Sequence, residues 1–235
     1  MTPRERVLTA LARKQPDRVP WQMRFTPAIQ ETFEKKTGAK VPAEYFDFDM
    51  RDIHPVKTQK NTDFSKYMGD SSSRLTGMSE WGVGRIRGSV AHFDDYVHPL
   101  KDVENPEELD KYPWPDVDAD YRYEPLKEQI RILKDKGYAV AGYVPMMNGS
   151  VFENTWVLRG LENLLTDFLV NKEYANHILD KVTDLNANAT KKLVEAGVDI
   201  IYTGDDVGTQ KGMMMSPEIW REMIKHRVAR IIKAG

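Results

Sequence analysis

The segment IIYTGDDVGTQKGMMM places two adjacent carboxylates, Asp205 and Asp206, where an apolar run gives way to a loop containing Gly208 and Gly212. Carboxylates at such a position can exchange protons with a substrate or hold it in place. Successive strand residues point to opposite sides, so in a strand that continued through Asp206 one carboxylate faces a site and the other supports the loop. The sequence predicts a catalytic pair, with loop capping or an ion pair with Lys211 as the structural alternative.

Three further residues are candidates for binding a substrate. Gln210 lies in the loop after the aspartates, and its amide is a neutral donor and acceptor. Asn148 and Glu153 follow another apolar run, YAVAGYVP, and we expect them to reach the same end of the sheet. The structural alternative for Asn148 and Glu153 is helix capping and interaction with the positive end of a helix.

The elements that position these residues alternate between helices and strands. Apolar residues at spacings of three and four from Ala175 to Leu193 predict a long helix, which Gly197 ends, and the run VDIIYTGDD predicts the buried strand that follows. Earlier in the chain, RVPWQM predicts a strand over 18–23 and TPAIQETFEKKTG predicts a helix over 26–38. This alternation, with apolar runs too continuous for a sheet with one exposed face, predicts a parallel sheet covered by helices.

A TIM barrel is the favoured form of this α/β sheet. The chain lacks both G-x-G-x-x-G after a strand and G-x-x-x-x-G-K-[ST], which mark the two commonest nucleotide-binding folds. A helix ends at Gly235 where another strand is expected, and only about four core strands precede it, against about eight in a barrel. We therefore expect residues 1–235 to form the N-terminal two thirds of one (β/α)₈ domain, apparently incomplete at its C-terminus, with a β-hairpin insertion around 74–100.

Composition excludes several classes of function. The 34 basic and 36 acidic residues give a formal net charge of -2, so no charge excess points to nucleic acid or an anionic membrane. The chain has no cysteine, and its five histidines form no ligand motif, so no metal ligand is assigned within it. With no long apolar segment and a charged N-terminus, we expect a cytoplasmic protein with a small-molecule substrate, and a homo-oligomer is left open.

Four separated segments resemble the uroporphyrinogen decarboxylase superfamily. They are the opening MTPRERVLTALARKQPDRVP, the segments SEWGVGRI, DDYVHPL and YPWPD taken together, NGSVFENTWVLRGLENLLTDFLVN, and TGDDVGTQKGMMMSPEIWREM. The likeness runs over nearly the whole chain and is greatest to the corrinoid-dependent methyltransferases and O-demethylases. It implies a TIM barrel with its site at the carboxyl ends of the strands.

The resemblance implies a methyltransferase that moves a methyl group from a methoxylated or methylated small substrate to a corrinoid protein. It also implies zinc in the complete enzyme, with ligands expected beyond Gly235. The family's decarboxylases, which need no cofactor, are the alternative, because Arg24 matches the first of their substrate-binding arginines. Phe25 and Thr26 then depart from that arginine-rich pattern, which weakens the decarboxylase reading. A barrel-derived binding module without catalysis is the third interpretation.

Overall fold

The centre of the fold is a three-stranded parallel sheet, seen in a computed structural model that describes residues 1–88, 94–145 and 149–235. The strands lie in the order β1 (Met50–Ile53), β5 (Ala139–Tyr143) and β6 (Ile200–Tyr202). All residues of β5 are buried because this strand lies between the other two. The predicted parallel α/β arrangement is therefore present.

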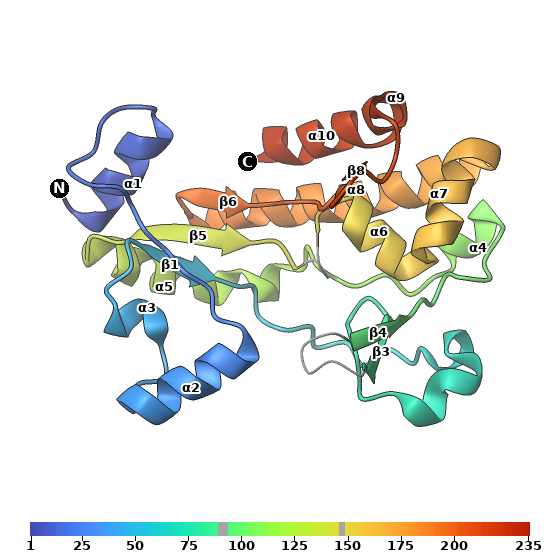
Figure 1. Cartoon of the computed structure of the whole chain (residues 1–235), viewed down its shortest axis with the longest axis horizontal. Coiled ribbons are helices and arrows are strands. Elements are labelled where there is room, and N and C mark those ends of the chain that lie inside the picture. Colours follow the sequence, from blue (N-terminus) through green and yellow to red (C-terminus); the bar gives the residue numbers. More distant parts are fainter. Residues whose placement is uncertain (89–93, 146–148) are drawn as a thin grey trace.

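Two helices pack on one face of this sheet, α5 (Glu124–Asp135) and α8 (Lys172–Ala196) (Figure 1). Their apolar stripes meet the strands in the main core, which contains Ile53 and Val140 from the strands, Ile130 from α5 and Leu193 from α8. Because side chains alternate along a strand, the neighbouring residues point to the other face of the sheet. That second face is the one available for a site.

The first helix, α1 (Pro3–Leu11), lies at the amino ends of the strands. Thr2 and Glu5 form a capping box at its start, as the residue types indicate. The Arg4 backbone N–H donates to the Gly137 carbonyl at 2.8 Å, and the Arg4 guanidinium contacts Asp199 at 2.8 Å. Since Gly137 lies two residues before β5 and Asp199 directly precedes β6, α1 closes this end and leaves the carboxyl ends free.

The predicted strand at 18–23 is wrong, because this segment is extended but belongs to no sheet. Its contacts explain the difference. The Trp21 N–H donates to the Asp49 side chain at 2.9 Å, and the Trp21 carbonyl accepts from the Asp49 N–H at 3.2 Å. One backbone hydrogen bond and one side-chain bond hold the segment beside β1 without forming a ladder.

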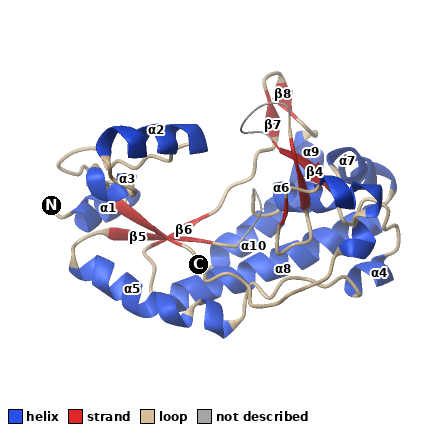
Figure 2. Ribbon diagram, turned by 90° about the horizontal axis from the view of Figure 1, so that it is seen from below, coloured by secondary structure: helices blue, strands red, loops and turns tan. Residues whose placement is uncertain are grey.

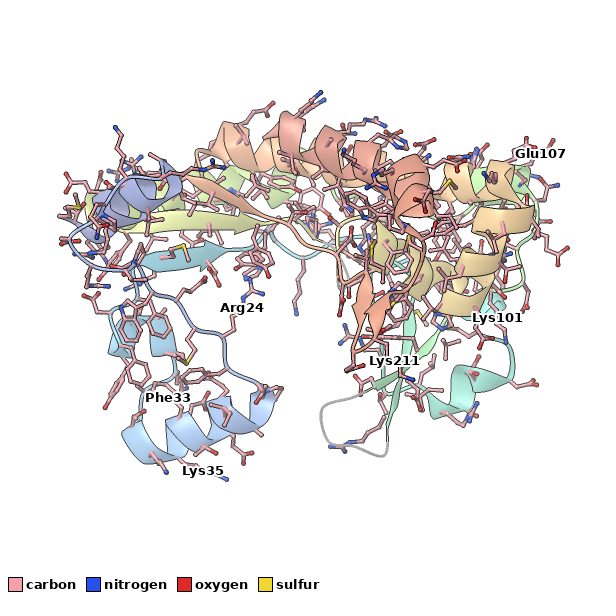
Figure 3. The ribbon with its side chains drawn as sticks, turned by 45° about the horizontal axis from the view of Figure 1, so that its top comes forward. Arg24, Phe33, Lys35, Lys101, Glu107 and Lys211 are labelled. Atoms are coloured by element: carbon pink, nitrogen blue, oxygen red, sulfur yellow. The ribbon has the colours of Figure 1, made fainter. Side chains whose placement is uncertain are left out.

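Helices α2 (Pro27–Thr37) and α3 (Pro42–Tyr45) form a small lobe beside this segment. The lobe is held by aromatic rings, in which Phe33 lies edge-on to Phe25 at 5.5 Å and to Tyr45 at 5.4 Å. Gly38 ends α2 in the left-handed conformation, as predicted. In Figure 3, Phe33 points inward from α2 and Lys35 points away from the lobe.

Residues 54–123 form a second, antiparallel sheet with short helices around it. The strands are β2 (Gly77–Met78), β3 (Gly84–Arg87) and β4 (Asp94–Val97). The helices are the 3₁₀ turns Ser65–Tyr67, Gly69–Arg74 and Asp120–Arg122, and α4 (Pro106–Asp110). This sheet falls in the range predicted for a β-hairpin, of which residues 89–93 lie outside the described part; that it is an insertion in a barrel stays a prediction.

The remaining elements follow β5 and β6, and three of their helices pack against α8. They are α6 (Phe152–Arg159), α7 (Leu161–Val170), the hairpin strands β7 (Gly208–Thr209) and β8 (Gly212–Met213), α9 (Pro217–Ile219), a π-helical turn (Trp220–Lys225) and α10 (His226–Ala234). Gly160 separates α6 from α7 at a φ of 91°. In Figure 2, α10 runs beside α8.

The described residues contain three parallel strands rather than the eight of a closed barrel. The predicted barrel is thus represented by one arc of strands with helices on its outer face. Within the described part of the chain, no helix combines the length and the apolar character needed to cross a bilayer.

We expect residues 1–235, expressed alone, to self-associate. Among the described strands, β6 has a neighbour on one side only, and exposed apolar side chains, Tyr202, Met213 and Ile232, lie near its open edge. Sedimentation velocity should show dimers or larger species that diminish in an Ile232→Glu variant. A monodisperse monomer at all concentrations contradicts the prediction.

Candidate functional site

Three rings stack at the carboxyl ends of the parallel strands, on the face opposite α5 and α8. His54, directly after β1, lies 4.9 Å from the Tyr143 ring, and Tyr143 lies 4.7 Å from the Tyr202 ring, both pairs nearly parallel. The strand register explains the order, because Tyr143 and Tyr202 are direct partners across β5 and β6. The result is a continuous aromatic surface spanning three strands.

Arg24 packs onto this aromatic surface. Its guanidinium carbon lies 4.5 Å from the Tyr143 ring centroid and 4.2 Å from that of Tyr202, which is cation–π geometry. Figure 3 shows Arg24 at this end of the sheet, on the segment that leads to α2. Arg24 thus presents a positive charge beside flat rings, a combination suited to an aromatic or anionic substrate.

A cleft of about 720 Å³ adjoins the aromatic surface. His54 and Tyr143 line it from the parallel sheet, and Trp81 lines it from the antiparallel sheet. Three exposed cations also line it: Lys57, Lys60 and Arg85. Volume and lining are those of a site for a small molecule that combines an apolar body with an anionic group.

Asp205 is fixed by the loop that precedes α6. Its carboxylate accepts hydrogen bonds from the backbone N–H groups of Val151 at 3.0 Å and Glu153 at 3.0 Å, and from the Ser150 hydroxyl at 3.3 Å. The strand β6 ends at Tyr202, so Asp205 lies in the loop that follows it. Its geometry is that of a helix N-terminal cap supplied from another loop.

Glu153 makes the reciprocal contact. Its Oε2 accepts the Asp206 backbone N–H at 2.8 Å, while the Asp206 side chain is exposed and accepts from the Gly208 N–H at 3.0 Å. Gly149 makes the close approach of the two loops possible, because a Cβ on it would lie 2.6 Å from Glu153 Oε2 and closer still to Asp205 Oδ1. Asp205, Asp206 and Glu153 are therefore brought together as predicted from sequence, while their catalytic role stays a prediction.

Two of these carboxyl groups have raised pKa values. Burial raises the pKa of Glu153; the hydrogen bond from the Asp206 N–H opposes the shift, and the negative charges of Asp205 and Asp206 add to it. Burial also raises the pKa of Asp205, although its hydrogen bonds from the Glu153, Phe152 and Val151 backbone and the Ser150 hydroxyl act in the opposite direction. Each group therefore holds a proton more readily than an exposed carboxylate.

The other sequence candidates are dispersed. Gln210 is exposed between β7 and β8, and Figure 3 shows the neighbouring Lys211 at the tip of this hairpin. Lys211 forms no ion pair with Asp205 or Asp206 among the described residues, whereas the loop-capping alternative is seen, because Asp205 accepts from the Val151 and Glu153 N–H groups and Asp206 accepts from the Gly208 N–H. Asn148 lies outside the described residues.

Sequence reasoning missed the stack of His54, Tyr143 and Tyr202. The available signal was position, because each of these residues ends or directly follows a strand. What was lacking was β1 itself, whose residues MRDI alternate in burial but carry two charges in four positions. If β1 is not predicted, His54 falls in a predicted loop.

The described residues include no group of three or more His, Asp or Glu side chains arranged to hold a metal ion. Glu153 and Asp205 already accept backbone N–H groups, so their oxygens are committed in part to other partners. The zinc implied by resemblance therefore does not fit this cluster, and no chemistry is derived through it.

Comparisons with known proteins place these features in a family. The uroporphyrinogen decarboxylase (URO-D) family profile matches residues 85–235. No curated protein matches the sequence. Among solved structures, the chain is similar to a methyltransferase from Methanosarcina mazei, with a TM-score of 0.57 and 18% identity over 100% of this chain and 67% of that one. At this identity the structural likeness supports the fold, and the family match covers most of the chain: the protein belongs to the uroporphyrinogen decarboxylase family.

Proposed function

We propose that the protein is a methyltransferase that moves a methyl group from a methoxylated or methylated small substrate to a corrinoid protein. The observation that carries the proposal is the cleft with its floor of stacked rings at the carboxyl ends of the strands, formed by His54 and Tyr143 and flanked by Arg24. A flat methylated substrate can stack there, at the same edge of the sheet as the segments after β5 and β6 that carry Glu153 and Asp206. The fold shared with a methyltransferase supports the same reading.

The corrinoid partner and zinc enter the proposal from the sequence resemblance. A methyl acceptor must approach from the open side of the sheet, where the exposed Asp206 and Gln210 lie. The described carboxylates do not form a zinc site, so the steps assigned to this chain are binding, orientation and proton handling.

Decarboxylation of a porphyrinogen is the second candidate, and one observation favours it. A substrate with many carboxylates needs several cations, and the cleft supplies Lys57, Lys60 and Arg85 in addition to Arg24 nearby. These cations lie far from Arg24 in sequence. The absence of further arginines at Phe25 and Thr26 therefore argues less strongly against a decarboxylase than the sequence alone indicates. A binding module without catalysis remains the third.

One assay separates the three. We expect the protein to transfer methyl groups from 4-methoxybenzoate or a related ether to cob(I)alamin and to leave uroporphyrinogen unchanged. Decarboxylation of uroporphyrinogen without methyl transfer establishes the second candidate, and binding of either compound without turnover establishes the third.

Arg24→Gln should weaken binding of 4-methoxybenzoate by about fivefold, because cation–π interactions at an exposed guanidinium contribute up to about 1 kcal/mol. Isothermal titration calorimetry measures the change. Lys35→Gln, on the same lobe but pointing away from it, is the matched control. Equal affinities of both variants and the wild type remove Arg24 from the site.

A further inference from the structure

The segment after β5, which runs into the first turn of α6, and the loop after β6 are joined by two carboxylates, each of which accepts at least one backbone N–H from the other segment. Asp205 accepts from Val151 and Glu153, and Glu153 accepts from Asp206. The Ser150 N–H also donates to the Gly204 carbonyl at 2.8 Å. Glu153 is therefore held through both its backbone and its side chain, which fixes the position of its carboxyl group.

Asp205 and Glu153 differ in how many of their carboxylate oxygens accept hydrogen bonds from described residues. Asp205 uses both oxygens, since Oδ1 accepts from Val151 and Glu153 and Oδ2 accepts from Val151 and Ser150. Glu153 uses Oε2 for Asp206, and no described residue donates to its Oε1. The Glu153 side chain is also half-buried, whereas that of Asp206 is exposed. Asp205 is thus arranged as a support, whereas Glu153 has one carboxylate oxygen, Oε1, to which no described residue donates.

We propose that Glu153 is the catalytic group that gives a proton to the leaving oxygen of a methyl ether, and that Asp205 is its positioning residue. This rests on the proposed function and narrows its substrate class to oxygen-bound methyl groups. In the step, an electron pair of the methyl acceptor forms a bond to the methyl carbon, and the carbon–oxygen bond breaks. Its electron pair stays on the oxygen, which takes the Glu153 proton, and the resulting carboxylate regains a proton from water.

Methyl ethers and quaternary ammonium compounds differ in whether their leaving groups need a proton. An ether oxygen leaves as an anion and benefits from a proton donor, while a quaternary ammonium leaves as a neutral amine and needs none. Glu153→Gln keeps a side-chain oxygen for the Asp206 N–H but has no acidic proton. We therefore expect it to lower kcat for 4-methoxybenzoate by about a hundredfold with little change in KM.

The pH dependence of kcat distinguishes an acid catalyst from a residue with a purely structural role. The charged groups acting on Glu153 are Asp205 and Asp206, both negative, and they favour its protonated form. Because the protonated form is the active one, kcat should fall as pH rises through the pKa of Glu153. That decline should be absent in Glu153→Gln, and ¹³C NMR of labelled glutamate should show a carboxyl with the same pKa.

The test uses the 235-residue protein with cob(I)alamin as methyl acceptor, comparing 4-methoxybenzoate with the trimethylanilinium cation. Glu162→Gln, an exposed glutamate on α7, is the matched control and should retain wild-type kcat. Asp205→Asn should lower kcat while leaving the acid in place. If the wild type is active and Glu153→Gln keeps the wild-type kcat or pH profile, the role proposed for Glu153 is wrong, while the proposed function stands. A wild type inactive with methyl ethers overturns the proposed function as well.

Discussion

Replacing Asp49 with alanine is expected to lower the free energy of unfolding by about 3–5 kcal/mol, the usual cost of removing one partner from a buried ion pair. The Asp49 side chain is fully buried and contacts the Arg6 guanidinium at 2.5 Å and that of Arg18 at 2.8 Å. It also accepts the Trp21 N–H at 2.9 Å. Its loss leaves Arg6 buried with Asp17 as its remaining carboxylate, and releases the segment that carries Arg24.

Asp17→Ala is the matched control, because Asp17 contacts the same arginine but is 41% exposed. Its removal should cost about 1 kcal/mol or less. Urea denaturation followed by tryptophan fluorescence measures both variants, and equal effects contradict the assignment of Asp49 as the anchor.

The same anchor makes stability depend on pH. Burial alone would raise the pKa of Asp49, but the hydrogen bond from the Trp21 N–H and the guanidinium groups of Arg18 and Arg6 outweigh it and hold the pKa below its ordinary value. A carboxyl group with a depressed folded-state pKa stabilises the protein above its unfolded pKa, near 3.9, and the contribution is lost as pH falls through the folded value. Asp49→Asn should therefore reduce the acid-induced part of unfolding measured by circular dichroism.

Local signals predicted many elements well. The helix ends at Gly38 and Gly197 follow from residue chemistry within a few positions. The strand at 18–23 failed because its residue pattern allows extension, whereas a strand also needs a ladder partner. That partner is decided by Asp49, a residue distant in sequence, whose side chain occupies the Trp21 N–H.

The site, too, was predicted only where local sequence signals were sufficient. The position of Asp205 and Asp206 after an apolar run indicated a shared edge of the sheet with Glu153, and the structure brings the three together. The division of work between the aspartates could not be predicted, because β6 stops at Tyr202 and the loop geometry then depends on contacts with residues 150–153. The stacked rings depend on register between strands that are far apart in the chain.

Gly149→Ala is expected to reduce kcat for methyl transfer by about a hundredfold, because misplacing a catalytic group by about 1 Å can cost that much. The new methyl group meets Asp205 Oδ1 and Glu153 Oε2, the latter at 2.6 Å. Neither oxygen can simply rotate away. Both accept backbone hydrogen bonds that join the two loops, so the substitution must break these bonds or move the loops.

Gly204→Ala tests whether any added methyl group in these loops has the same effect. Gly204 precedes Asp205, and a Cβ there has no atom within 4 Å. We expect near wild-type kcat and unchanged hydrogen exchange at the Val151 and Glu153 amides, both of which should exchange faster in Gly149→Ala. If Gly149→Ala speeds exchange but leaves kcat unchanged, the reciprocal contacts stabilise the loops without positioning the reacting groups. If kcat falls together with amide protection, the placement of the Glu153 and Asp205 carboxylates depends on Gly149, where the two segments approach too closely to leave room for a side chain.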